Sequence, residues 1–254
     1  DATQLPALFF YVFALALKLI GHGILALRLV TTVAGILTLL FTYLLARELF
    51  DHRIAVLAAF FLAVMRWHVN FSRLAMHGIF APLFMAATFY FLIRGLRGKG
   101  AANFVAAGVM MGVGLQGYYS FLLMPLIVVC LLLHHAVFGR VLPWRTLAAG
   151  VAAFGITAAA VYAPLGVWAL QHPEEFSQRT QAVTITKGHP PGEVARLVWS
   201  NTGKHLLMFS SAGDRNGRHN LPGAPMLDRI TGCLFALGVG LALWRWREPG
   251  HFLL

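Results

Sequence analysis

The fold is decided by one apolar stretch, ILALRLVTTVAGILTLLFTYLLA, which occupies residues 24–46 and is followed by Arg47 and Glu48. A helix needs about 20 mainly apolar residues to cross the roughly 30 Å hydrocarbon core of a bilayer, because each residue adds about 1.5 Å. The stretch contains a single charged side chain, Arg28, near one end. It therefore predicts a membrane-spanning helix.

Six further apolar stretches predict additional spans, at residues 54–65, 74–93, 101–119, 122–138, 147–170 and 230–243. Residues 5–20 are apolar but shorter and carry Lys18, so they predict either an interfacial helix or an eighth span. We expect an all-α, polytopic integral membrane protein. Its expected parts are an interfacial helix or extra span (1–23), a transmembrane bundle of six helices (24–170), an external loop (171–229), and a transmembrane helix with a cytoplasmic turn (230–254).

The composition agrees with a membrane location and argues against a nucleic-acid partner. Hydrophobic residues make up 59% of the chain and charged residues 11%, against roughly half and a quarter in soluble domains. The net charge of +11 then marks loops that stay inside, rather than a nucleic-acid surface. Cys130 and Cys233 lie in apolar runs without a ligand partner at metal spacing, so no metal site is expected.

Basic residues in alternate short loops predict the orientation. One set holds nine of them: Arg47, Arg53, Arg94, Arg97, Lys99, Arg140, Arg145, Arg245 and Arg247. The opposite set holds four: Lys18, Arg28, Arg66 and Arg73. Because basic short loops stay in the cytoplasm, we expect a cell (inner) membrane protein whose long loop, with a helical-looking stretch from Glu193 to Phe209, lies outside.

Two polar strings are candidates for binding a phosphate or a sugar. RWHVNFSRLAMH, at residues 66–77, places two arginines and two histidines at one membrane mouth. Guanidinium groups bind phosphate oxygens with paired hydrogen bonds. The alternative is that Arg66 and Arg73 only anchor the protein to lipid headgroups. GDRNGRHNLPGAPMLD, at residues 213–228, is rich in sugar-binding and phosphate-binding groups, and turn chemistry explains part of its composition.

Gly112, Gly114 and Gly117 match the G-x-G-x-x-G motif, but they lie inside an apolar helix with no preceding strand. Together with Gly108 they predict close helix packing. Tyr118 follows at the outer interface, where an aromatic belt and stacking against a sugar ring are the two alternatives.

The distribution of carboxylates bears on the type of membrane protein. No Asp or Glu occurs between Asp51 and Glu174. This weighs against a proton-coupled transporter, whose pathway needs intramembrane acids. A transporter or flippase for a lipid-linked or anionic solute, and a noncatalytic scaffold, remain alternatives to an enzyme.

Several motifs together resemble one family of membrane enzymes. They are LPALFFY (5–11), KLIG (18–21), ALRL (26–29), YLLARELF (43–50), WH (67–68), FSR (71–73), RHNLPG (218–223) and PMLD (225–228). The chain resembles GT-C fold membrane glycosyltransferases, in the family 39 set related to protein O-mannosyltransferases and RgtA/B/C/D-like enzymes. The family pattern usually has Pro before the Trp-His pair, where this chain has Arg66.

The resemblance implies transfer of a sugar from a polyprenyl-phosphate carrier, the donor substrate, to a glycan, lipid or protein acceptor on the outer face. It implies no certain cofactor beyond that donor. Arg28, His68 and Arg73 match positions near the donor phosphate, and the full set of candidate substrate-binding residues adds Tyr118, Arg218, His219 and Asn220. The family's catalytic Asp-Glu pair has no match, so we leave the catalytic residue unassigned and expect an incomplete chain with little or no transfer activity.

Overall fold

The computed structural model describes residues 7–139, 142–177, 184, 190–213 and 220–253, and the regular structure of this part is helical, without strands. The all-α expectation is confirmed. The chain divides into two compact units. The larger unit comprises Pro6–Leu165 and Val239–Leu254, and the described residues of Gly166–Gly238 belong to the smaller unit.

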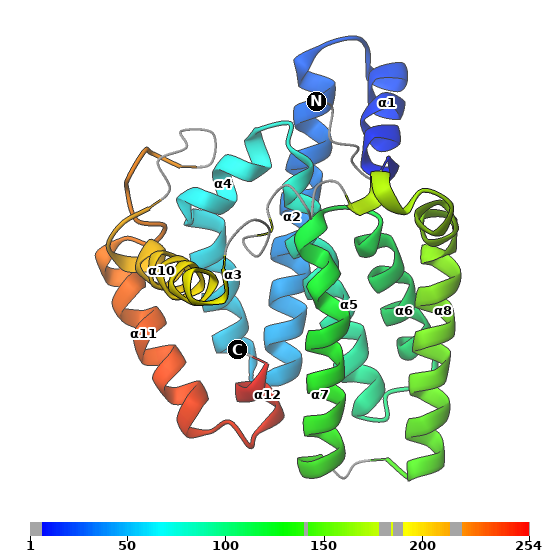
Figure 1. Ribbon diagram of the computed structural model, residues 1–254. Coiled ribbons are helices and arrows are strands. Elements are labelled where there is room, and N and C mark those ends of the chain that lie inside the picture. The colour runs from blue at the N-terminus through cyan, green and yellow to red at the C-terminus, as the bar shows by residue number, and fades with distance from the viewer. Residues whose placement is uncertain (1–6, 140–141, 178–183, 185–189, 214–219, 254) are drawn as a thin grey trace. The chain divides into compact units, whose positions relative to one another are not determined.

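The larger unit is built around α2 and α5. In chain order its helices are α1 (Leu8–Ile20), α2 (Ile24–Leu49), α3 (His52–Val64), α4 (Arg66–Arg73), η1 (His77–Ile79), α5 (Phe80–Leu96), α6 (Ala102–Leu115), η2 (Tyr119–Leu123), α7 (Met124–Phe138), most of α8 (Trp144–Gln171) and α12 (Pro249–Phe252). Helix α5 packs on both α2 and α6, whereas α1, α3 and α4 pack on α2 (Figure 1).

Within the described residues, four helices are long and apolar enough to cross a membrane. They are α2, η1 with α5, η2 with α7, and α8. Helices α3 and α4 form a further candidate that is bent by 61°, and α1, α6 and α11 (Arg229–Trp244) are apolar but shorter. A helix lies at each of the seven predicted spans. That the shorter helices also cross the membrane stays a prediction.

The bend between α3 and α4 follows from the local sequence. Asp51 caps α3 by accepting a hydrogen bond from the backbone N–H of Ile54 at 2.9 Å. The apolar run ends at Val64, and Met65 adopts an extended conformation before α4 begins at Arg66. The polar string RWHVNFSR begins at this break, so the apolar helix ends where α4 begins.

Glycines allow α6 to approach α8 closely, as the sequence predicted. A Cβ atom added to Gly112 would lie 2.8 Å from the carbonyl oxygen of Ala158, and one added to Gly108 would lie 2.9 Å from Cβ of Thr157. Such distances leave no space for a side chain. The packing role of the glycine-rich motif is therefore confirmed, and no strand precedes it in the part of the chain that the structure describes.

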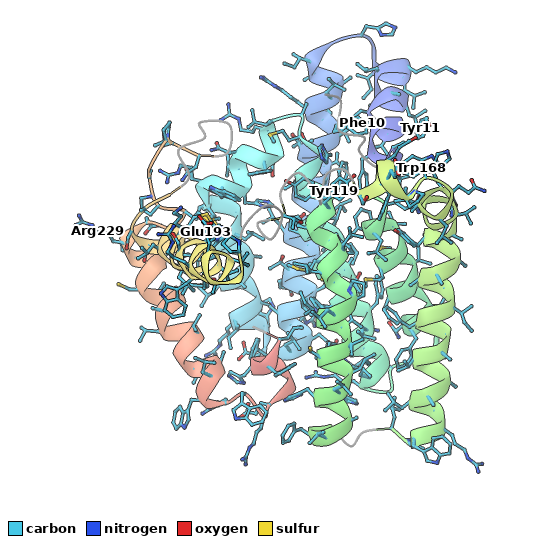
Figure 2. The ribbon with its side chains drawn as sticks, viewed as in Figure 1. Phe10, Tyr11, Tyr119, Trp168, Glu193 and Arg229 are labelled. Atoms are coloured by element: carbon cyan, nitrogen blue, oxygen red, sulfur yellow. The ribbon has the colours of Figure 1, made fainter. Side chains whose placement is uncertain are left out.

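The smaller unit contains α10 (Pro191–Ser210) and the beginning of α11. Figure 2 labels Glu193 in the first turn of α10 and Arg229 at the start of α11. Two backbone hydrogen bonds join the segment before α11 to the end of α10, from Met226 N to Met208 O at 3.0 Å and from Leu227 N to Phe209 O at 3.1 Å. The helix predicted from Glu193 to Phe209 is thus present as α10.

Candidate functional site

Hydroxyl groups hold α4 against the first turns of α2. Thr31 Oγ1 lies 3.1 Å from both the carbonyl oxygen of Arg28 and that of Ser72 and donates toward both. Thr32 Oγ1 donates to the same Ser72 oxygen at 3.2 Å. Thr31 is fully buried, so its hydroxyl depends on these carbonyl groups for its hydrogen bonds. The contact fixes the end of α4 beside the turn that carries Arg28.

Gly35 makes this contact possible because it presents no side chain to α4. A Cβ atom added to Gly35 would overlap the Ser72 side chain, with 2.8 Å between the two Cβ atoms, and would lie 3.7 Å from His68 Nε2. Ser72 is held in place by its own hydroxyl, which donates to the carbonyl oxygen of His68 at 2.7 Å. The imidazole of His68 therefore lies against α2 at Gly35.

Three of the predicted binding residues come together at this end of the larger unit. Arg28 follows the first turn of α2, and His68 and Arg73 belong to α4, which packs on that part of α2. Arg28 and Arg73 are exposed, and neither forms an ion pair with any residue that the structure describes. The end of the bundle around α4 thus carries two cations that remain available to an external anion.

We call the end of the larger unit that carries Arg28, His68 and Arg73 the mouth. Aromatic rings extend from this mouth toward η2. The ring of His77 lies 5.3 Å from that of Tyr118 and 5.6 Å from that of Phe10. His77 Nε2 is buried and has no hydrogen-bond partner among the described residues. Tyr118 is 40% exposed, so part of its ring remains accessible for stacking. Figure 2 shows Phe10 and Tyr119 at this same end of the larger unit.

The remaining predicted binding residues belong to the smaller unit or lie outside the described part. Arg218 and His219 are outside the described residues. Asn220 is only 4% exposed, and its side-chain amide donates to Ala224 O at 2.9 Å and to Pro225 O at 3.3 Å. The amide of Asn220 therefore stabilises its own turn, and a role in binding substrate remains a prediction.

Asp228, at the end of the second polar string, caps α11. Its carboxylate accepts hydrogen bonds from the Thr231 hydroxyl at 2.6 Å and from the backbone N–H groups of Thr231 and Ile230 at 3.0 Å. The bond from the Thr231 side chain, followed by that from the Thr231 backbone, holds the pKa of Asp228 below its usual range. The charged carboxylate thus caps the first turn of α11.

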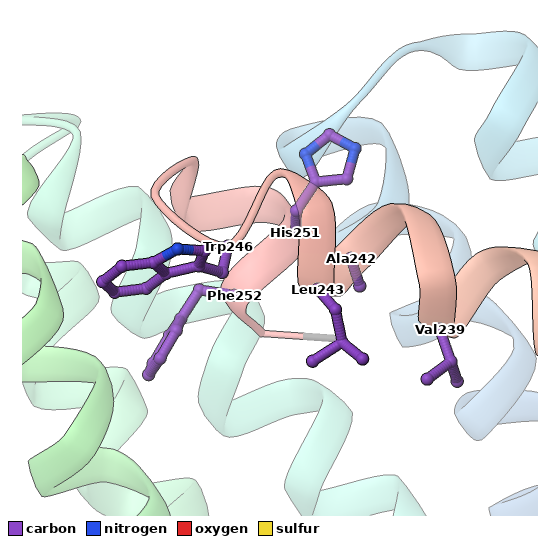
Figure 3. A pocket seen from close by; sticks show the side chains of 6 residues that line it. All are labelled: Val239, Ala242, Leu243, Trp246, His251 and Phe252. Atoms are coloured by element: carbon purple, nitrogen blue, oxygen red, sulfur yellow. The ribbon is translucent and has the colours of Figure 1, made fainter.

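Among the described residues, no group of three His, Cys, Asp or Glu side chains is placed to hold a metal ion. A pocket of about 430 Å³ lies at the other end of the larger unit, lined by Val239, Ala242, Leu243, Trp246, His251 and Phe252 (Figure 3). The pocket contains none of the predicted binding residues. Its lining is almost wholly apolar.

Sequence reasoning missed the residues that assemble the mouth. Thr31 and Gly35 are one turn apart on α2, and the buried Thr38 continues the same line. This stripe of small residues in an apolar helix predicts a close contact, but it does not name α4 as the partner. His77 stood within the first polar string, yet only the fold brings its ring beside Tyr118 and Phe10.

The fold and this mouth together define the class of protein. It is a multi-pass membrane protein with two exposed arginines, a half-buried histidine and accessible aromatic rings at one end of its helical bundle. Such a set of groups suits an anion that carries a ring, such as a sugar phosphate.

The chain belongs to the dolichyl-phosphate-mannose-protein mannosyltransferase family, whose model matches residues 4–168. No curated protein and no solved structure matches the chain. The chain is therefore a membrane glycosyltransferase of the GT-C type that uses a lipid-linked sugar and a protein or glycan acceptor, as the resemblance implied. A transporter or flippase is not favoured. The matched range includes Arg28, His68, Arg73 and Tyr118.

Proposed function

We propose that this chain transfers a sugar from a polyprenyl-phosphate carrier to a cell-envelope acceptor at the outer face of the cell membrane. Arg28 and Arg73 bind the carrier phosphate, and His68 and Tyr118 contact the phosphate and the sugar ring. The observation that carries the proposal is the pair of exposed arginines, which have no ion-pair partner among the residues that the structure describes and which the contact of Thr31 with Ser72 brings to one mouth.

The chemistry of transfer gives these cations a role. The acceptor oxygen forms a bond to the anomeric carbon of the sugar, while the bond from that carbon to the phosphate oxygen breaks and the carrier phosphate keeps the electron pair. The phosphate gains negative charge as it leaves, so cations beside it stabilise the transition state more than the bound donor. A lipid-borne phosphate reaches these arginines at the membrane surface, without entering the hydrocarbon.

The acceptor proton must pass to a base. The family's Asp-Glu pair does not occur in these 254 residues. We therefore propose that the chain binds the donor and that its transfer of the sugar is slow. Nine basic residues in one set of short loops against four in the other support an outward-facing mouth.

The test measures donor binding to the purified chain, with polyprenyl-phosphate mannose as the probe. Arg73→Gln and Arg28→Gln should each weaken binding about tenfold, because each removes a charge-assisted contact to the phosphate. Arg145→Gln removes an exposed cation at the start of α8 and should leave binding unchanged. Affinities in both mouth variants equal to that of the parent would contradict the proposed site.

A transfer assay tests the missing base separately. Membranes that contain the 254-residue chain are given the labelled donor together with protein and glycan acceptors. We expect donor binding with little labelled product. Efficient transfer would overturn the argument from the missing acid pair, while leaving the binding result intact.

A further inference from the structure

At the end of α2 opposite to Arg28, three cations surround Glu48. The Glu48 side chain is 6% exposed, and its Oε1 lies 2.7 Å from Lys99 Nζ and 3.4 Å from Arg97 Nη1. Arg94 Nη1 lies 3.7 Å from Oε2, and Arg97 also donates to the backbone carbonyl of Glu48. We refer to Glu48, Arg94, Arg97 and Lys99 as the Glu48 cluster.

The cluster is built into the turn between α5 and α6. Gly98 and Gly100 adopt φ values of 74° and 102°, which side chains other than glycine rarely adopt, and these values let the chain reverse directly after α5. Arg94 Nε donates to Asn103 Oδ1 at 3.2 Å, and Asn103 Nδ2 in turn donates to the carbonyl oxygen of Lys99 at 2.6 Å. The cations are therefore held in place before any ligand arrives.

The charges of the Glu48 cluster do not balance. One carboxylate faces three cations, which leaves an excess of two positive charges in a small volume. The side chains of Arg94, Arg97 and Lys99 are 33%, 41% and 47% exposed, so donors not used on Glu48 remain accessible. A second anion would relieve the repulsion among the cations and satisfy these donors.

The length of α2 places the cluster at the depth of lipid headgroups. Its 26 residues span about 39 Å, against a hydrocarbon core of about 30 Å. When the helix crosses the bilayer, both of its ends emerge from the hydrocarbon, and Glu48 is the penultimate residue. The anions that are abundant at this depth are phospholipid phosphates.

The apolar pocket of Figure 3 lies next to the cluster. Its lining residue His251 packs edge-on against the ring of Phe50, two residues after Glu48, with 5.4 Å between the ring centroids. Phe252 and Leu49 both pack against the same hydrophobic core. An apolar surface beside a cationic cluster has the two features that a phospholipid requires, one for its acyl chain and one for its phosphate.

We infer that the Glu48 cluster and the adjoining pocket bind an anionic phospholipid, with the phosphate on Arg97 and Lys99 and an acyl chain against Val239, Leu243 and Phe252. This site is at the opposite end of α2 from the proposed donor site and does not depend on the proposed function. The ligand remains bound at the membrane surface and undergoes no reaction.

The test compares binding of phosphatidylglycerol, phosphatidylcholine and inorganic phosphate to the full chain in neutral detergent, by native mass spectrometry. The parent should bind phosphatidylglycerol selectively. Each cation near a lipid surface contributes about fivefold to affinity, so Arg97→Gln/Lys99→Gln should weaken phosphatidylglycerol binding about 25-fold. Arg145→Gln, which removes an exposed cation outside the cluster, should not weaken it. Val239→Trp, which fills the pocket, should weaken binding of the lipid.

Two variants separate lipid binding from simple neutralisation of Glu48. Glu48→Gln raises the excess charge and should tighten phosphatidylglycerol binding about fivefold. Adding Lys99→Gln to Glu48→Gln removes one of the two cations that bind the phosphate and should therefore reverse this gain about fivefold. Equal binding of the two lipids, phosphate binding as tight as that of phosphatidylglycerol, or unchanged affinity in Arg97→Gln/Lys99→Gln would overturn the inference.

Discussion

Substitution of Gly35 by alanine tests the contact that assembles the mouth. The added methyl group overlaps the Ser72 side chain, with 2.8 Å between the two Cβ atoms, and Ser72 cannot move freely. Its carbonyl oxygen accepts from Thr31 and Thr32, and its hydroxyl donates to His68 O. A shift of α4 large enough to admit the methyl group breaks at least one of these hydrogen bonds.

The magnitude follows from opposing contributions. Overpacking costs about 1–3 kcal/mol, and each weakened hydrogen bond costs about 1 kcal/mol. The higher helix propensity of alanine offsets about 1 kcal/mol. With one hydrogen bond weakened, we expect Gly35→Ala to lower the free energy of unfolding by about 1–3 kcal/mol and to weaken donor binding, because His68 and Arg73 move with α4.

Equilibrium unfolding in mixed detergent micelles measures the stability, and titration with polyprenyl-phosphate mannose measures the binding. Gly155→Ala is the matched control, because Gly155 lies in α8 with no atom within 4 Å of an added Cβ. It should be neutral or slightly stabilising. Adding Ser72→Gly to Gly35→Ala removes the overlap, so the double variant should be more stable than the sum of the single effects predicts. A Gly35→Ala protein as stable as Gly155→Ala would refute the close contact between α2 and α4.

Three further predictions address other parts of the chain. Gly112→Val should destabilise the larger unit by about 2 kcal/mol or more, measured by the same unfolding assay, because α6 cannot approach α8 with a branched side chain between them. Because the pKa of Asp228 is lowered, its cap stabilises α11 above about pH 4, and this stabilisation is lost as the carboxylate protonates below that pH. Asp228→Asn should abolish this pH dependence, measured as helicity by circular dichroism. In a chain without native cysteines, cysteines at positions 73 and 219 should react with an impermeant reagent from outside, and a cysteine at position 99 only from inside. Labelling of position 73 from inside would contradict the outward-facing donor site, and labelling of position 219 from inside would contradict the external loop.

The helices were largely predictable, because the length of an apolar stretch and the polar residues that end it are local properties of the sequence. Residues 24–46 gave the position of α2 almost to its ends, and the glycine run from Gly108 to Gly117 correctly indicated helix packing. The path of the chain after Met65 was less predictable. The polar composition of α4 marks a membrane mouth, but the angle of its departure from α3 depends on the contact with α2, which joins residues about 40 apart in sequence.

The candidate site was predictable in its residue types and not in its assembly. Two arginines and two histidines in one string indicate phosphate chemistry, because their side-chain geometry is independent of the fold. The hydroxyl of Thr31 and the missing side chain of Gly35 act only through a partner helix, so no local pattern could assign their role. The same holds for Glu48, which looks like one of several loop charges in the sequence and becomes buried only when three cations converge on it.

Helix α2 is fastened at both of its ends, by Thr31 and Thr32 to Ser72 and by Glu48 to the residues that follow α5. A helix longer than the surrounding hydrocarbon ordinarily adjusts to membranes of different thickness by tilting. With both ends fastened, α2 cannot tilt without disturbing α4 or the turn after α5. Thinner bilayers therefore strain the contacts of Thr31 and Thr32 with Ser72, and we expect bilayer thickness to affect binding at the proposed donor site.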